Sequence, residues 1–279
     1  MQGRLSPKIG GKIQAFPIKN WKSEFSKAKE IGFYSIEWIF ENPIDENPLY
    51  TTNGRQEIVN LIQESGVQVE YVCADYFMQN PIVNEKQNLK FSEILILKLL
   101  NFCKEIGAKC IEIPFVDQSS LLNRDYSFLI NFFNSFENEL KSLDLLLNLE
   151  TDLNANPFKN LISELNLKIG ANYDIGNSAS LGYNFFEEIE AYGKRINNVH
   201  IKDRVLGGST IEFGKGNAKI SNVLQCLSDI NYENGITLQG YRGDNDIEII
   251  HWFEFCITHL SNKLFRKLYD FRSEEHTSE

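Results

Sequence analysis

Short runs of β-branched and apolar residues alternate with longer amphipathic segments along nearly the whole chain, and this alternation constrains the fold more than any other feature. Eight such runs occur, and each is followed by a segment with helical periodicity. Repeated strand–helix units are typical of a parallel sheet covered by helices. We therefore expect eight parallel strands, at residues 1–5, 34–40, 67–76, 109–116, 145–151, 168–175, 197–203 and 235–241.

The helical segments support the same interpretation. Apolar residues at three- and four-residue spacing predict helices within 19–32, 53–66, 89–108 and 125–144. Gly32, Gly66 and Gly107 follow three of these segments, at the position where a left-handed helix end favours glycine. Links from helix to strand are short and links from strand to helix are longer, as in a barrel whose working loops follow the strands. The predicted fold is α/β, a single (βα)8 TIM barrel.

A doubly wound open sheet is the main alternative fold. It would favour a phosphate-binding fingerprint after the first strand, but QGRLSPKIGGK contains neither GxGxxG nor GxxxxGK[ST]. One domain over residues 1–271 is expected, because α/β barrels of about 250 residues fold as one unit. The last eight residues, RSEEHTSE, resemble the translation of a sequencing-library adapter, and we interpret 272–279 as an adapter-derived or disordered tail.

Charge and cysteine content narrow the possible functions. The chain has 28 Lys and Arg against 38 Asp and Glu, and the net charge of −10 repels a nucleic-acid backbone. The five cysteines are scattered and form no CxxC pair, so we expect reduced thiols rather than a redox dithiol. The most apolar run, ILILKLLNF, contains Lys98 and is too short to cross a bilayer. We expect a cytoplasmic protein with no nucleic-acid or membrane partner.

Four polar residues stand at the ends of successive expected strands. Glu150 ends LLLNLE, Asp174 lies in ANYDIGN, His200 lies in NNVHIKDR and Gln239 lies in ITLQGYR. The carboxyl ends of barrel strands meet at one face, where the loops build the active site. Two carboxylates, an imidazole and an amide oxygen suit one divalent ion, Mn²⁺, Mg²⁺, Co²⁺ or Zn²⁺. Each residue alone could cap a helix or pack in the core, but their joint occurrence favours a metal site.

The segments NLETD, NYDIGN, VHIKDR and LQGYRG resemble, in order and spacing, those of the xylose-isomerase-like sugar phosphate isomerases and epimerases. The resemblance extends from the first residue to about Leu268. It implies a (βα)8 barrel with one divalent ion, held by Glu on strand five, Asp on strand six, His on strand seven and Glu on strand eight. The corresponding residues here are Glu150, Asp174, His200 and Gln239.

Gln239 departs from that pattern. In the epimerases that the chain resembles, the glutamates on strands five and eight remove and return a proton on opposite faces of the substrate. An amide can still offer an oxygen to a metal ion, but it cannot carry protons near neutral pH. Glu150 is therefore the expected catalytic base, and Lys202 and Glu37 are further catalytic candidates. Glu37 interrupts the apolar YSIEWIF and is interpreted either as an acid or as a partner of Arg4.

Basic and amide side chains near the strand ends are candidate substrate ligands. Strand parity places Lys202 and Arg204 on one face. Together with Arg4 and Arg242, they could hold a phosphate or carboxylate, or they could pair with local carboxylates. Asn177 could orient a substrate hydroxyl or only form the turn after its strand.

These observations favour a divalent-metal-dependent isomerase or epimerase that acts on a sugar or sugar phosphate through an enediolate. A metal-dependent dehydratase or lyase of a polyol or keto acid shares the first step. A catalytically altered barrel that only binds its ligand is a third interpretation. An endonuclease-IV-like repair enzyme needs several strand histidines, and only His200 lies on an expected strand. The expected partner is a small-molecule carbohydrate, and a homo-oligomer is left open.

Overall fold

The computed structural model describes residues 5–12 and 14–240. Within them, seven strands form one parallel sheet in the order β1-β2-β3-β4-β5-β6-β9. Each strand overlaps one of the predicted segments, and the remaining segment, 1–5, lies outside the described residues except for Leu5. The strands are β1 Trp38–Ile39, β2 Tyr71–Cys73, β3 Cys110–Phe115, β4 Leu146–Thr151, β5 Ile169–Asp174, β6 Ile196–Ile201 and β9 Gly235–Leu238.

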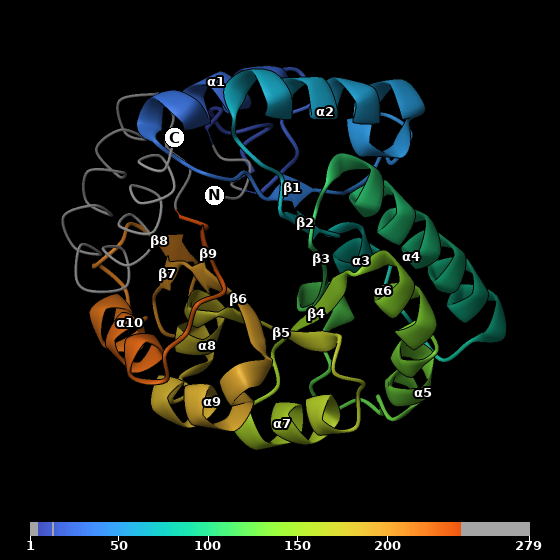
Figure 1. Cartoon of the computed structure of the whole chain (residues 1–279). Coiled ribbons are helices and arrows are strands. Elements are labelled where there is room, and N and C mark those ends of the chain that lie inside the picture. The colour runs from blue at the N-terminus through green and yellow to red at the C-terminus, as the bar shows by residue number, and fades with distance from the viewer. Residues whose placement is uncertain (1–4, 13, 241–279) are drawn as a thin grey trace.

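Helices surround this sheet on its outer side (Figure 1). Gly32, Gly66 and Gly107 end α1, α2 and α4 with φ angles of 90, 79 and 80°, the left-handed conformation predicted for them. The helices are α1 Trp21–Ile31, α2 Thr52–Ser65, α3 Tyr76–Gln79, α4 Lys86–Ile106, α5 Phe128–Asn134, α6 Glu137–Leu143, α7 Ala155–Ser163, α8 Ile175–Leu181, α9 Phe185–Tyr192 and α10 Ile220–Asp229, with 3₁₀ turns η1 Pro48–Tyr50, η2 Asp117–Ser119 and η3 Gly193–Arg195.

The structure corrects one helix prediction, because segment 125–144 forms two helices, α5 and α6, rather than one. Asn134, the last residue of α5, donates from Nδ2 to the Glu164 carbonyl at 2.9 Å. Its Oδ1 accepts the backbone N–H of Asn166 at 2.8 Å. These bonds tie the end of α5 to the turn that precedes β5, beside the break between α5 and α6.

A short antiparallel pair that the sequence did not predict follows β6. Its strands are β7 Asp203–Arg204 and β8 Thr210–Ile211. The buried Asp203 carboxylate accepts backbone N–H groups from Gly214, Gly216 and Ala218 at 2.8 to 3.0 Å. One side chain thus fixes the loop after β6, and this loop packs against α8 at the carboxyl end of the sheet.

The apolar core lies between the sheet and its helices, whereas the inner face of the sheet is polar. Alternate strand residues such as Ile113, Leu149 and Val199 are buried in the apolar core. TIM barrels usually fill their interior with branched apolar side chains, and buried polar groups are costly unless they are paired. The polar side chains on the inner face of the sheet therefore indicate that a functional site lies there. Its buried members include Glu37, Glu112, Asn148, Glu150, Asn172, Asp174, Asn198, His200 and Thr237.

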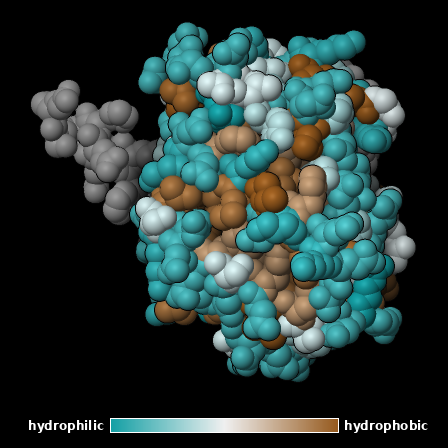
Figure 2. Space-filling model, turned by 90° about the vertical axis from the view of Figure 1, so that its right-hand side faces the viewer, coloured by the Kyte–Doolittle hydropathy of each residue, from teal (hydrophilic) through white to brown (hydrophobic). Residues whose placement is uncertain are grey.

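Apolar side chains also gather in the middle of the face shown in Figure 2, the side of the molecule where α4 and α5 lie in Figure 1. Phe91 and Ile94 are the large exposed apolar side chains on α4, and the Phe91 ring centroid lies 6.4 Å from that of Tyr76. Among the described residues, every helix is too short or too polar to pass through a bilayer.

Candidate functional site

The four predicted ligand residues lie at the carboxyl ends of neighbouring strands. Glu150 is near the end of β4, Asp174 ends β5, His200 is near the end of β6 and Gln239 follows β9. Asp174 and His200 are direct partners in the parallel register of β5 and β6. All four side chains are buried.

His200 is the centre of the site. Its Nε2 lies 2.9 Å from Glu37 Oε2 and 3.2 Å from Glu112 Oε2, and its Nδ1 lies 3.6 Å from Glu150 Oε2. Burial by itself lowers the pKa of His200, but the charges of Glu37 and Glu112 outweigh it and raise the pKa well above its usual value. The two carboxylates orient the ring, so that Nε2 is engaged below the strand ends and Nδ1 faces Glu150.

Glu150 is held by two amide donors. Asn177 Nδ2 donates to its Oε1 at 2.7 Å, and Asn172 Nδ2 donates to its Oε2 at 2.9 Å. Burial, followed by the negative charge of Asp174, raises the pKa of Glu150 to about 8. The carboxyl group is therefore fixed in position and able to hold or release a proton near neutral pH.

Asp174 has two functions that use different oxygens. Its Oδ1 caps the start of α8 by accepting the backbone N–H groups of Gly176 and Asn177 at 2.9 and 2.8 Å. Its Oδ2 forms an ion pair with Lys202 Nζ at 2.6 Å. Burial alone would raise the pKa of Asp174, but the positive charges of Lys202 and His200 lower it below its usual value. Asp174 is thus an ionised ligand candidate on a rigid helix start.

Lys202 and Gln239 contact each other across the end of the sheet. Lys202 Nζ donates to Gln239 Oε1 at 2.7 Å, and both side chains are buried. The predicted pairing of Lys202 with a local carboxylate is also found, in its contact with Asp174. Lys202 therefore bridges two of the four predicted ligand residues.

Glu112 is a site residue that the sequence analysis missed. It lies within β3 with no exposed surface, and it accepts from Asn198 Nδ2 at 2.9 Å. Burial, followed by the charge of Glu37, raises the pKa of Glu112 to about 7. Burial would also raise the pKa of Glu37, but His200 lowers it below its usual value. The signal was present in the sequence, because Glu112 interrupts the apolar KCIEIPFV as Glu37 interrupts YSIEWIF.

Of the three arginines proposed as substrate ligands, Arg204 lies within the described residues. Arg204 donates from one guanidinium nitrogen to Asn177 Oδ1 at 2.7 Å, and two of its nitrogens donate to the Gly208 carbonyl at 2.7 and 3.0 Å. These acceptors are neutral oxygens, so neither compensates the charge of the guanidinium. Arg4 and Arg242 lie outside the described residues.

The donor set fits a divalent cation. The ligand atoms of Glu150, Asp174 and His200 lie within 4.8 Å of one another, and a second group made of Glu37, Glu112 and His200 does the same. The Oε1 atom of Glu37 is buried without a hydrogen-bond partner. Mixed carboxylate and imidazole donors suit the ions that proteins hold in this way. Metal-bound histidines commonly donate their second ring N–H to a carboxylate, as Nε2 of His200 is placed to do.

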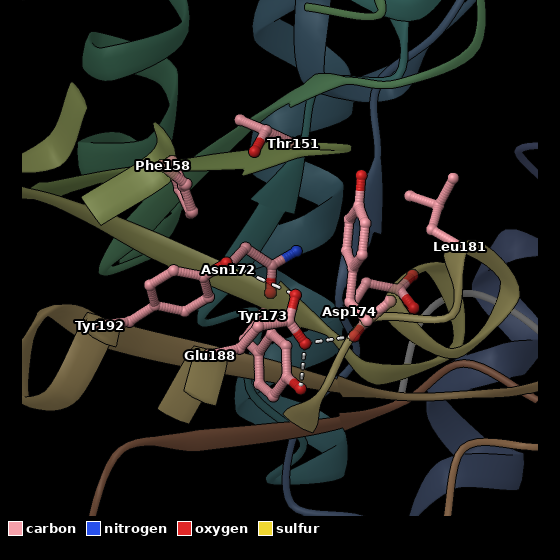
Figure 3. Close-up of a pocket in the computed structure, with 10 residues that line it drawn as sticks. Thr151, Phe158, Asn172, Tyr173, Asp174, Leu181, Glu188 and Tyr192 are labelled. Carbon is pink, nitrogen blue, oxygen red and sulfur yellow. Dashed lines mark hydrogen bonds between the residues drawn. The ribbon is translucent and has the colours of Figure 1, made fainter. Parts of the chain in front are cut away.

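A second polar cluster lies just outside the sheet, next to Asp174 (Figure 3). The carboxyl group of Glu188 on α9 accepts from the Tyr173 hydroxyl at 2.9 Å and from the Ser178 hydroxyl. The Tyr192 hydroxyl lies 3.5 Å from its other oxygen. The cluster links β5, α8 and α9, and it lines a small cavity that has room for about one water molecule.

Comparison with known proteins agrees with this architecture. A family model described as a xylose isomerase-like TIM barrel matches residues 25–250, which is most of the chain. The chain belongs to the xylose isomerase-like TIM barrel family. No curated protein sequence matches the chain significantly.

Several solved structures share this fold over most of the chain. A xylose isomerase domain protein from Planctomyces limnophilus has 16% identity and a TM-score of 0.71, with 85% of this chain and 90% of that chain covered. The IOLI protein with a bound zinc atom has 13% identity and a TM-score of 0.70, over 86% and 92%. D-psicose 3-epimerase from Clostridium cellulolyticum H10 has 14% identity and a TM-score of 0.70, over 86% and 94%. At these identities, the likeness shows the shared fold.

Proposed function

We propose that the protein is a divalent-metal-dependent isomerase or epimerase that acts on a sugar or sugar phosphate through an enediolate. The convergence of Glu150, Asp174 and His200 at the ends of three neighbouring strands carries this proposal. The zinc in the IOLI structure and the epimerase among the similar structures support it. The proposal includes a small carbohydrate as the partner and the cytoplasm as the place of action. It also takes residues 1–5 as the eighth strand, which would close the barrel between β1 and β9.

Glu150, Asp174 and His200 would hold the ion, with Gln239 as the fourth donor. A divalent ion bound there would polarise the carbonyl oxygen of the substrate and the adjacent hydroxyl oxygen. Glu150 transfers the proton, because Asn172 and Asn177 hold its carboxyl group in a fixed position.

Arg204 and Asn177 are proposed to orient the substrate. Among the described residues, the Arg204 guanidinium donates to the neutral oxygens of Asn177 and Gly208, so its positive charge remains available for an anionic oxygen of the substrate. The assignment of Arg4 and Arg242 to the same anion stays part of the proposal. Glu37 acts on His200 in this scheme, because its Oε2 contacts the imidazole.

A dehydratase is the second candidate function, and the position of Lys202 favours it. The ammonium group lies beside Gln239 at the end of the sheet, where it could protonate a departing hydroxyl group. Isomerisation and dehydration begin with the same proton removal. They differ in whether water leaves, so product analysis separates them.

The experiment uses the full-length protein loaded with Mn²⁺ and a panel of ketoses and ketose phosphates in heavy water. We expect about one bound ion per chain and stereospecific deuterium incorporation at one carbon, detected by elemental analysis and NMR. His200→Ala should lose both the ion and the exchange while the circular dichroism of the fold is retained. Metal content equal to wild type in folded His200→Ala would exclude this site.

A further inference from the structure

Lys202 occupies the same oxygens that the divalent ion needs. Its Nζ lies 2.6 Å from Asp174 Oδ2 and 2.7 Å from Gln239 Oε1. Asp174 and Gln239 are two of the four ligand residues in the proposed function. The ammonium group, with two oxygen atoms at hydrogen-bond distance, occupies the position that a metal ion would take on this edge of the site.

The stem of Lys202 is held by close packing as well as by charge. A Cβ atom on Gly176, in the first turn of α8, would come within 2.9 Å of Lys202 Cβ and Cγ and of its carbonyl oxygen. A glycine at this position therefore lets the start of α8 lie directly against the lysine. Lys202 is only 7% exposed, so its position is fixed inside the protein.

The oxygens Asp174 Oδ2 and Gln239 Oε1 cannot hold the ammonium group and the divalent ion in the same position at once. With the ion bound, the carboxylates of Glu150 and Asp174 would supply two negative charges, which a divalent ion alone would neutralise. Gln239 adds an acceptor oxygen but no charge, so it does not compensate the ammonium when the ion is bound. Two cations that share Asp174 Oδ2 also repel each other at short range in a buried site of low dielectric constant.

We propose that Lys202 is an internal cation that competes with the divalent ion for Asp174 and Gln239. Metal loading displaces the ammonium group from these oxygens toward the substrate. The inference depends on the proposed metal-dependent function, since it concerns the same ligand residues. It gives Gln239 a role of its own, because a neutral acceptor holds the lysine less tightly than a carboxylate would and leaves it free to exchange.

The first test compares Mn²⁺ affinity by isothermal titration calorimetry for wild type, Lys202→Met and Lys168→Met. Lys168 is the matched control, because its 2.6 Å pair with Asp144 lies just before β5 and β4, at the opposite end of the strands. Removing the competitor should tighten binding at least about tenfold in Lys202→Met only. Equal or weaker binding in folded Lys202→Met would overturn the competition while leaving the metal site standing. Absence of Mn²⁺ binding in all three proteins would overturn the proposed function, and the competition with it.

The second test uses the wild-type protein, so it does not depend on the folding of a variant. Brief acetic anhydride labelling, quantified peptide by peptide by mass spectrometry, reports how accessible each lysine amine is. Lys202 should react several-fold faster after Mn²⁺ is bound, whereas Lys168 should be unchanged. Unchanged labelling of Lys202 in the metal-loaded protein would show that the ammonium group stays on Asp174 and Gln239, and the inference would fail.

Discussion

His200 depends on two carboxylates that do not belong to the proposed ligand set. Glu37 and Glu112 both contact Nε2, which leaves Nδ1 directed toward Glu150. Removing one of these charges should weaken Mn²⁺ binding by about 10- to 100-fold, because partners that orient a metal-bound histidine contribute this much to affinity. Glu37→Gln and Glu112→Gln can be measured by isothermal titration calorimetry.

Glu24→Gln is the control for these variants, because Glu24 is another buried glutamate but lies on α1. Its affinity for Mn²⁺ should equal that of wild type. If Glu37→Gln behaved like Glu24→Gln, the contact between Glu37 and His200 would have no bearing on the metal ion.

Gln239 sets the number of catalytic bases in the proposed reaction. It follows β9, and β5 and β6 separate β9 from β4, which carries Glu150, so the two residues reach the site from different sides. With an amide at 239, aldose–ketose interconversion should exceed 3-epimerisation. Gln239→Glu adds a titratable group there and should raise 3-epimerisation at least about tenfold, as followed by NMR in heavy water. Efficient epimerisation by the wild type would show that another residue supplies the second base.

Parity along the strands explains which site residues could be predicted from the sequence. Glu150, Asp174 and His200 were predictable because each is a charged or titratable group at the end of an apolar strand. Glu112 was missed because it lies below the strand end. It stands two residues before Pro114, which is the register partner of Glu150. The roles of the inward amides Asn172 and Asn198 depend on contacts between strands, which no single segment contains.

The loop after β6 is an element organised by one carboxylate. Asp203 accepts three backbone N–H groups, and its Oδ1 would lie 2.2 Å from a Cβ on Gly216, so the loop backbone comes very close to it. Asp203→Ala leaves these donors without their acceptor and should lower the free energy of unfolding by about 1 to 3 kcal/mol. Urea denaturation measures this change. Trypsin should also cut faster after the exposed Lys215.

Glu212→Ala is the control for this variant, because Glu212 is an exposed carboxylate in the same loop that pairs with Lys215 at the surface. Its unfolding free energy should stay within about 0.5 kcal/mol of wild type. Equal stability of Asp203→Ala and Glu212→Ala would mean that the loop is held by other contacts.

The hydrophobic periodicity of the sequence predicted the main helices and strands. The elements that it missed depend on contacts between residues far apart in the chain. The amphipathic segments and their terminal glycines were sufficient for α1, α2 and α4. At the end of α5, Asn134 bonds to residues 164 and 166, some 30 positions along the chain. The β7–β8 pair likewise depends on Asp203 meeting backbone groups more than ten residues away. Local sequence patterns cannot predict such distant partners.

At the scale of the whole molecule, Glu188 links stability to pH. A glutamate in FFEEIEAY is typical of an exposed helix face, but the fold buries this one against Tyr173, Ser178 and Tyr192. Burial raises the pKa of Glu188 to about 7, although the three hydroxyl groups act in the opposite direction. The folded state therefore binds a proton that the unfolded chain releases near its ordinary value of 4.5.

The sign of the effect follows from this difference. Below pH 4.5, a carboxyl group whose pKa is raised on folding is protonated in both states and does not change the free energy of unfolding. Between pH 4.5 and about pH 7, the unfolded state loses its proton first, so the free energy of unfolding falls as the pH rises. Glu188→Gln removes the titration. Between pH 5 and pH 8, wild type should lose about 2 to 3 kcal/mol more stability than the variant, measured by urea denaturation in the presence of a chelator.

The control is Glu190→Gln, at an exposed position on the same helix, and its stability should change with pH as that of wild type does. The buried carboxyl groups near His200 titrate in all three proteins, so the difference between the curves isolates Glu188. Parallel curves for wild type and Glu188→Gln would mean that Glu188 keeps an ordinary pKa and that its cluster joins β5, α8 and α9 without responding to pH.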